Sequence, residues 1–346
     1  MALLWIEGFE GVGSTDGAAP SPTGILLRKY AYVGYPPDQY TLVRPGRIAG
    51  HSIEYTAGWP DNRTGPLTTN ATMIVGFGYY FSAAFNGKII GLYDFGQQGM
   101  NVRLTSAGEL AVYRDTTVLA TTSGLGLTTA TWYYIEFKVL CDGSAGSYEL
   151  RVDGTSKLSA SGINTKAGSH TYHNIFQMVG SQSGVCRFDD LYILDGSGSA
   201  NNDFLGKRRA VGRFPSGDVG GYQDFTCSSG SNHYALVDEN PVNDDTDYVE
   251  DGTIGHKDLW DYPSLSGTGS TINGIQINSM ARETDATSMT LNTLIKSGAT
   301  EDAGTGEVVG STTYKVMKRI SETDPNTGVA WTVSGVNAAQ FGVKVG

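Results

Sequence analysis

Cysteine is scarce in this sequence of 346 residues, and the three that occur, Cys141, Cys186 and Cys227, lie far apart. No two of them have the spacing of a metal-binding pair. An odd number so widely separated is also unlike the dense disulfide framework of a small secreted domain. We therefore expect a chain that folds in a reducing cytoplasm and has no metal or cofactor of its own.

Long hydrophobic runs are missing as well. No apolar segment approaches the ~20 residues that span a bilayer, so we expect no membrane among the partners. Residues 1–7 form a short apolar stretch without a basic leader or a small-residue cleavage site. That stretch is more typical of a first strand than of a signal peptide.

Charge is low and of one sign. Charged residues make up 17% of the chain, and its net charge is −11. Because an acidic surface repels phosphate backbones, we expect no nucleic acid partner. The one basic cluster, Lys207–Arg209 with Arg213, is too short to reverse this. We interpret it as an exposed edge strand guarded by charge.

Glycine is abundant instead: the chain has 47 glycines, well above the usual share of ~7%. Tyrosine, threonine and serine are also plentiful. β-branched and aromatic side chains fill pleated faces, and glycine supplies the positive φ angles of tight turns. This composition predicts an all-β protein.

Alternating side chains mark the strands of the first part of the chain. Within Trp132–Val139, Ile135 and Phe137 share one face, whereas Glu136 and Lys138 lie on the opposite face. A period of two with one apolar face indicates sheets that pack face to face. The same pattern is found in Met73–Phe81 and Tyr148–Gly154.

A change of composition divides the chain. Polar, glycine-rich stretches follow residue 195, and we place the boundary between two domains at residues 1–214 and 215–346. The second part has alternating strands at 271–278, 288–296 and 312–320. We expect it to form a second, smaller β-sandwich.

The first domain resembles the laminin-G-like, concanavalin-A-like jelly roll. Three segments carry the resemblance in the order typical of that fold: Gly108–Tyr113, Thr131–Val139 and Tyr148–Gly154. They read as G-x-L-x-V, then T-W-Y-x-I-x-F, then Y-x-L-x-V-D-G. The resemblance implies a jelly-roll sandwich for most of residues 1–214.

The second domain is similar to a segment of tailed-phage virion proteins that often follows such a jelly roll. The similarity lies in Asn232–Glu239, Asp244–Val249, Asp324–Thr332 and Phe341–Lys344. It implies a non-enzymatic structural protein of the virion surface, of the tail-fibre, tail-tip or capsid-decoration type. Its role would be to assemble or stabilise the particle and to adhere to the host.

The same resemblance implies the partners and the location. We expect a homo-oligomer, as a weaker expectation a trimer, that contacts other virion proteins of the capsid or tail and binds host-surface glycans. The chain would be assembled in the host cytoplasm and would end in the virion.

Jelly rolls also host glycoside hydrolases, which need paired carboxylates. Glu283–Ser288 is the nearest match to such a motif, and it lacks the final glutamate and lies outside the jelly roll. Asp189 and Asp190 are adjacent, so on a strand they would point to opposite faces. Asp324–Trp331 is interpreted as a turn that anchors Trp331. We therefore predict no catalytic residue and no enzyme.

Metal ligands were sought in the same way. His170 and His173 are three residues apart, which does not suit a metal pair on a strand. The acidic run at 238–251 favours a solvated loop, with calcium binding as the alternative, although it does not fit an EF-hand.

Carbohydrate binding is the rival function. Trp59, Tyr35 and Tyr40 lie in loop-like segments rich in proline and glycine, where aromatic rings can stack on sugars. The alternative to the virion role is thus a lectin-like, carbohydrate-binding module, with a glycoside hydrolase as the weaker form of that alternative.

Overall fold

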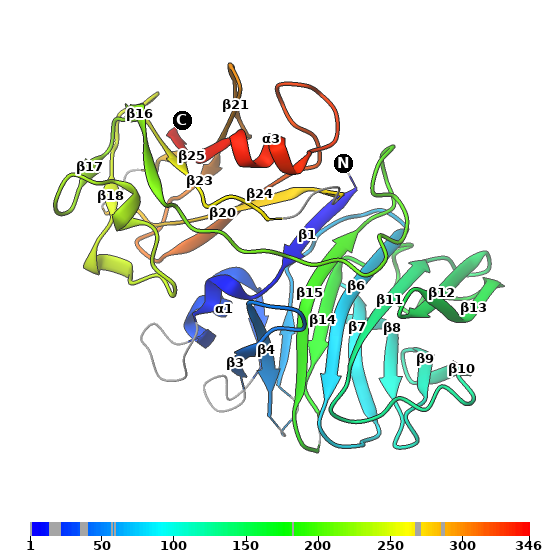
Figure 1. Cartoon of the computed structure of the whole chain (residues 1–346). Coiled ribbons are helices and arrows are strands. Elements are labelled where there is room, and N and C mark those ends of the chain that lie inside the picture. Colours follow the sequence, from blue (N-terminus) through cyan, green and yellow to red (C-terminus); the bar gives the residue numbers. More distant parts are fainter. Residues whose placement is uncertain are drawn as a thin grey trace. The chain divides into compact units, whose positions relative to one another are not determined.

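The computed structural model describes residues 2–13, 22–34, 41–56, 58, 60–181, 183–266, 271–284 and 288–346. It divides into two compact units, Met1–Val211 and Gly212–Gly346 (Figure 1). Strands dominate both units. The α-helices of the described residues are short: α1 at Pro22–Lys29 and α3 at Val333–Ala338. The prediction of an all-β protein is confirmed, and none of the described helices is long and apolar enough to cross a membrane.

Unit 1 is a sandwich of two antiparallel sheets. The first, sheet A, has eight strands in the order β13-β12-β11-β6-β15-β4-β3, with β1 paired to β15. Its strands are β1 (Leu3–Glu7), β3 (Thr41–Pro45), β4 (His51–Tyr55), β6 (Thr72–Phe81), β11 (Trp132–Leu140), β12 (Gly146–Val152), β13 (Thr155–Ile163) and β15 (Cys186–Leu194). The predicted first strand at the N-terminus is β1.

Sheet B, the second layer of unit 1, has seven strands in the order β10-β9-β8-β7-β14-β5-β2. They are β2 (Tyr32–Val33), β5 (Asp61–Arg63), β7 (Gly87–Asp94), β8 (Gln97–Leu104), β9 (Leu110–Arg114), β10 (Thr117–Thr121) and β14 (Ile175–Val179).

The core of unit 1 lies between the two sheets. Ile135 and Phe137 of β11 are fully buried and pair with Phe77 and Val75 of β6. The ring of Phe77 also lies 6.3 Å from that of Phe176 in sheet B, measured between centroids. The alternation in the sequence therefore identified the inner face of sheet A correctly.

The outer face of sheet A is covered by residues 203–210, which we call the strap. The backbone N–H groups of Leu205 and Gly206 donate to Tyr192 Oη and Glu136 Oε1, at 3.2 and 2.8 Å. The prediction that Lys207–Arg209 forms an edge strand is wrong. The backbone of the strap is not hydrogen-bonded to the backbone of a neighbouring strand, and it binds side chains of sheet A instead. Glu136, expected on an open face, is fully buried beneath it.

Unit 2 contains a six-stranded sheet and two two-stranded sheets, β17–β18 and β20–β24. The sheet follows the order β16-β19-β25-β21-β22, with β23 on β21. Its strands are β16 (Gly217–Gln223), β19 (Lys257–Asp261), β21 (Thr290–Ser297), β22 (Thr300–Ala303), β23 (Glu307–Val308) and β25 (Gln340–Val345). The strands of the two-stranded sheets are β17 (Thr226–Cys227), β18 (Val249–Glu250), β20 (Ile275–Ala281) and β24 (Lys315–Ser321).

One core of unit 2 forms around Trp331. The side chains of Ile295 and Phe341 surround it, and Ile275 and Ile277 of β20 pack against this cluster. Asp324 shapes the preceding turn by accepting the backbone N–H of Asn326 at 2.9 Å. The expected anchoring turn is therefore present.

Candidate functional site

Several residues singled out in the sequence do not build a site. Tyr35, Tyr40 and Trp59 lie outside the described residues, as does part of Glu283–Ser288. Among the described residues no three metal-ligating side chains gather. In the acidic loop, Asp245 binds Arg282 and Tyr314, and Asp251 binds His256. The calcium alternative thus has no ligand cluster in that part of the chain.

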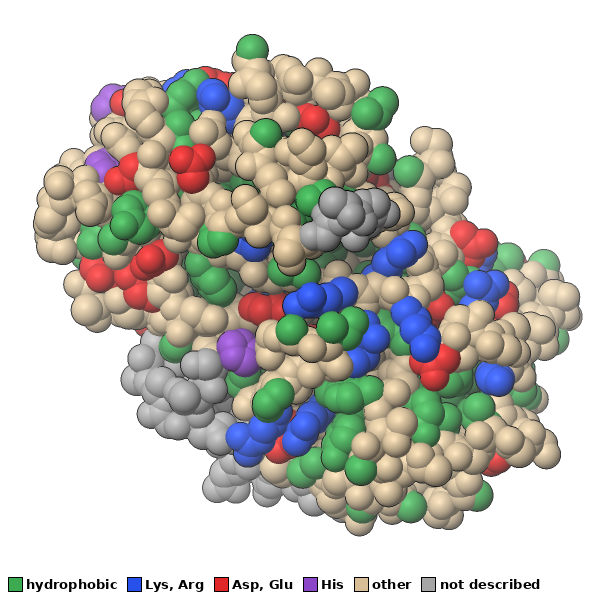
Figure 2. Space-filling view, viewed as in Figure 1, with side chains coloured by type: hydrophobic (Ala, Val, Ile, Leu, Met, Phe, Trp, Pro, Cys, Tyr) green, Lys and Arg blue, Asp and Glu red, His purple; other side chains and the backbone are tan. Residues whose placement is uncertain are grey.

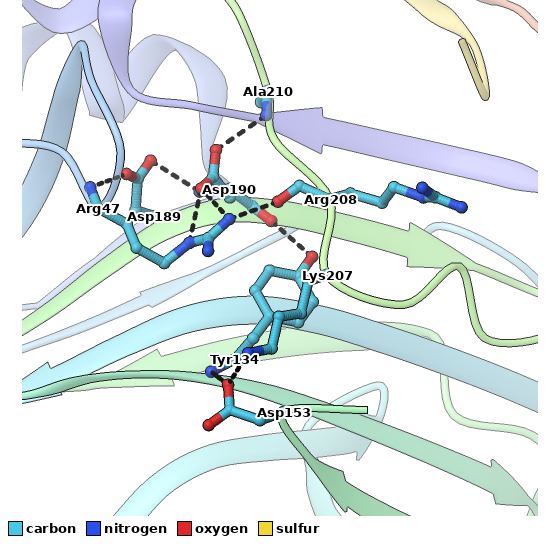
Figure 3. Close-up of polar contacts among 8 residues, drawn as sticks. All are labelled: Arg47, Tyr134, Asp153, Asp189, Asp190, Lys207, Arg208 and Ala210. Carbon is cyan, nitrogen blue, oxygen red and sulfur yellow. Dashed lines mark hydrogen bonds and ion pairs between the residues drawn. The ribbon is translucent and has the colours of Figure 1, made fainter. Parts of the chain in front are cut away.

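Asp189 and Asp190 do come together, which corrects the expectation that they diverge. The pairing of β15 with β6 shifts register after Asp189, and Asp190 has a φ of 52°. This bulge turns both carboxylates toward Arg47 (Figure 3). Asp189 Oδ2 accepts the Arg47 backbone N–H at 2.6 Å, and Asp190 Oδ2 accepts Arg47 Nε at 2.8 Å.

This carboxylate pair anchors the strap. Asp190 Oδ1 accepts the backbone N–H of Ala210 at 2.9 Å, and Arg47 Nη2 donates to the carbonyl of Arg208 at 2.7 Å. Burial, together with the charge of Asp190, raises the pKa of Asp189 to about 7. These groups are occupied by the chain itself, so their role is structural.

Basic side chains are numerous on the outer face of sheet A, and they are visible in the space-filling view (Figure 2). Six of them form ion pairs with carboxylates. The pairs join Arg44 and Arg187 to Glu54, Arg47 to Asp190, Lys138 to Asp203, Arg151 to Glu149 and Lys207 to Asp153. A charged ligand would have to displace these partners.

The outer face of sheet B is different. One row of residues runs across six strands in continuous register, and we call it the cross-strand row. It consists of Tyr32, Arg63, Gln177, Gly91, Asn101 and Tyr113. Five steps of about 4.8 Å between strands separate the two tyrosines by about 24 Å. At the centre Gly91 leaves the room that the side chains of Gln177 and Tyr93 occupy.

Beneath this face lies a layer of buried polar side chains. Asp61, Gln177 and Asn101 are 8%, 3% and 0% exposed, although they point away from the core. Asp61 Oδ2 accepts Arg63 Nε at 2.7 Å and also binds the amide of Gln177. Asn101 Oδ1 accepts Arg103 Nε at 3.0 Å. Buried partners therefore fix the arginines from below, which is how preorganised sites are built.

The cations of this face also lie over aromatic rings. The guanidinium of Arg63 is 4.9 Å from the ring centroids of both Tyr32 and Tyr93. That of Arg103 is 4.1 Å from Tyr113. Lys88 Nζ lies 5.3 Å from Tyr93. The result is a half-exposed surface of alternating rings and positive charge.

Lys88 is the least compensated of these cations. Its Nζ donates to neutral oxygens, at 2.9 Å to Tyr93 Oη and 2.6 Å to Gln98 Oε1. Among the described residues no carboxylate lies within ion-pair distance of Lys88 or Arg103. Burial, with Arg63 and Arg103 nearby, lowers the pKa of Lys88 to about 8. Burial raises the pKa of Tyr93, so Lys88 is the group that exchanges protons near neutrality.

None of these residues was identified from the sequence. A signal was present, because Lys88 and Gln177 are polar residues within strands whose neighbours are apolar. That signal does not say which residues of different strands become neighbours. The row exists only through the pairing of strands that are far apart in the chain.

No protein-family model and no curated protein matches this chain. Among solved structures, a glucuronan lyase from Trichoderma reesei is 12% identical over 48% of this chain and 90% of its own, with a TM-score of 0.38. An alginate lyase is 11% identical over 54% of this chain and 95% of its own, with a TM-score of 0.41. Domain 4 of a Geobacillus stearothermophilus arabinanase, solved with arabinotriose, is 14% identical over 56% of this chain and 92% of its own, with a TM-score of 0.38.

These matches contradict one prediction. The chain was expected not to be an enzyme, yet the structures to which it is similar are lyases, sialidases and part of an arabinanase. That prediction is withdrawn. At such low identity the likeness concerns the sandwich fold alone, and it assigns no reaction and no residue of this chain.

Proposed function

We propose that the outer face of sheet B binds a carbohydrate chain that carries acidic groups. The observation that supports this is the surface over the cross-strand row: Tyr32 and Tyr113 lie at its two ends, and between them the partly exposed cations Arg63, Lys88 and Arg103 are held by polar side chains of this face. Sites for small molecules and sugars combine flat aromatic surface with a few fixed polar groups that set orientation. An extended chain lying along the row would meet both.

The preference for acidic groups rests on the cations. Lys88 and Arg103 lack a carboxylate partner among the described residues, whereas the sheet A cations named above each pair with one. A carboxylate on a sugar would provide charge-assisted hydrogen bonds to the fork of Arg103 and to Lys88. The chain as a whole is acidic, with a net charge of −11.

The test is a binding experiment with matched variants. Alginate and glucuronan oligosaccharides serve as acidic probes and arabinotriose as the neutral one, each titrated by calorimetry. Lys88→Gln and Arg103→Gln should each weaken acidic-probe binding about tenfold, the size of one lost charge-assisted contact. Lys138→Gln is the control, because Lys138 is ion-paired on sheet A.

Two results would contradict the proposal: no binding of any probe by the unaltered chain, or equal losses in Lys138→Gln and Lys88→Gln. The same mixtures, assayed for newly formed chain ends, show whether a bound carbohydrate is also cleaved. Cleavage would make the face an active site, and its absence would make it a binding face only.

The virion role stays a prediction. Membership of a tailed-phage particle, self-association as a trimer and contacts with capsid or tail proteins rest on the sequence resemblance. Carbohydrate binding on sheet B is compatible with the host adhesion expected of such a protein. Locating the chain in an intact particle by labelled antibody would test that role separately.

A further inference from the structure

Phe95, at the tip of the β7–β8 hairpin, has an unfavourable backbone conformation. Its φ is 51°, in the left-handed region that a β-carbon disfavours, and its side chain is 47% exposed. Phe9 also has a positive φ, but it is fully buried and its packing accounts for it. Burial does not account for Phe95. Phe95 and Gly96 form the two-residue turn of the hairpin, which requires a positive φ at its first position, where Asn, Asp or Gly is usual. A bulky exposed ring at that position points to a function for the ring.

The ring of Phe95 belongs to a surface group of three, with His170 and Tyr172, which we call the aromatic platform. The centroid of His170 lies 5.1 Å from that of Phe95 and 4.9 Å from that of Tyr172. Phe95 and Tyr172 are 6.3 Å apart. The side chain of His170 is 43% exposed, so the platform faces solvent.

Buried polar residues hold the platform in place. Asp94 is 6% exposed and accepts the backbone N–H and Nδ1 of His170, at 3.0 and 2.6 Å. Asn174, 1% exposed, accepts the backbone N–H of Phe95 at 2.9 Å. Gly168 permits the close approach, because a β-carbon there would collide with Asp94. The rings are thus fixed by the same kind of support as the arginines of sheet B.

We infer that the aromatic platform binds one further sugar ring of the carbohydrate chain whose remainder lies on the outer face of sheet B. This inference rests on the proposed function. It follows from the position of Phe95 at the tip of the hairpin, one residue pair beyond Tyr93 and Gln98, which hold Lys88. Asp94 points to the opposite face of β7 from Tyr93, so the carbohydrate chain would pass over the end of sheet B to reach the platform. The imidazole of His170 uses Nδ1 for Asp94, which leaves Nε2 for a sugar hydroxyl.

The experiment compares a short and a long probe on one variant. Phe95→Gly removes the ring and places glycine where φ is positive, so the hairpin should fold at least as well. Binding of an alginate octasaccharide should weaken about three- to tenfold, as expected for one lost stacking contact. A trisaccharide that fits on sheet B alone should bind as before. Val118→Ala, an exposed apolar side chain of β10 in the same sheet, is the matched control.

The outcomes separate this inference from the proposed function. Unchanged octasaccharide binding by Phe95→Gly, with Lys88→Gln still defective, overturns the platform alone. Equal weakening of both probes also overturns it, because the ring would then act on the whole face. Failure of the unaltered chain to bind either probe overturns both. Tyr172→Ala should reproduce the effect of Phe95→Gly on the long probe.

Discussion

The hydroxyl of Tyr192 donates to Glu136 Oε1 over 2.5 Å, and the same carboxylate oxygen accepts the backbone N–H of Gly206 at 2.8 Å. Two strands of sheet A and the strap therefore share one buried oxygen. The strap ends directly before unit 2 begins at Gly212.

Removing the Tyr192 hydroxyl should loosen the strap. Tyr192→Phe takes one donor from Glu136 and leaves the Leu205 N–H without its acceptor, at a cost of about 1–3 kcal/mol. The strap contains the trypsin sites Lys207, Arg208 and Arg209, so cleavage there should accelerate roughly tenfold. Tyr80→Phe is the control, because Tyr80 of β6 lies on the same outer face of sheet A as Tyr192 of β15. Equal cleavage rates in the two variants would contradict the role of the shared oxygen.

The stability of unit 1 should depend strongly on Phe137. Phe137→Ala removes a fully buried ring between the sheets and should destabilise by about 3–5 kcal/mol. Lys138→Ala, half-exposed on the outer face, should cost well under 1 kcal/mol. Hydrogen exchange of peptides from β6 and β11, measured across a urea series, gives the loss in free energy of unfolding for each variant. Similar losses of stability in the two variants would contradict the burial of Phe137 between the two sheets.

Glu136 shows where sequence reasoning reached its limit in this fold. Alternation placed its side chain on the outer face correctly, and on that basis Glu136→Ala would be nearly neutral. Periodicity reports which face a side chain occupies but not what lies on that face. Since the strap covers Glu136, we now expect Glu136→Ala to cost about as much as Tyr192→Phe or more.

Asp189 and Lys88 show two further limits. The divergence expected of Asp189 and Asp190 fails because a β-bulge breaks the period of two, and a single sequence carries no clear sign of that bulge. Lys88 gains its neighbours through the pairing of β7 with β8 and β14. Such registers are set by the whole sheet, so the fold class could be predicted whereas the candidate site could not.

Unit 1 should lose stability as the pH rises from about 4 to about 8. Burial, with the charges of Asp189, Glu7 and Asp190, raises the pKa of Glu10 from 4.5 to about 8, and Asp189 rises from 3.8 to about 7. At these two carboxyls the folded state therefore binds more protons than the unfolded state across this range, so stability falls with pH. Buried His173 acts in the opposite direction below about pH 6, because burial lowers its pKa from 6.5 to about 4, but it is one group against two. Glu10→Gln should flatten the curve of urea midpoint against pH. A rise in stability over the same range would contradict these shifts.

The three thiols should differ in reactivity. Cys141 and Cys186 are buried, and burial raises their pKa values to about 11 and about 12. Cys227 is half-exposed. Because the thiolate is the reactive form, iodoacetamide at pH 8 should label Cys227 alone in the folded chain. Mass spectrometry of the peptides checks this. Labelling of Cys186 before unfolding would show that the core of sheet A opens readily.

Binding of an acidic carbohydrate should weaken as the pH rises through about 8. Lys88 has its pKa lowered from 10.5 to about 8, so it is charged below that pH and neutral above it. Loss of its charge removes one attraction to a carboxylate, and affinity should fall about tenfold between pH 7 and pH 9. Lys88→Arg keeps the charge throughout and should abolish the change, whereas Lys88→Gln should bind weakly at every pH. Titrations of an alginate tetrasaccharide at a series of pH values, at constant ionic strength, measure all three. If Lys88→Arg loses affinity over the same pH interval as the unaltered chain, the titrating group is not Lys88. Lys88 would then not contribute to the binding face.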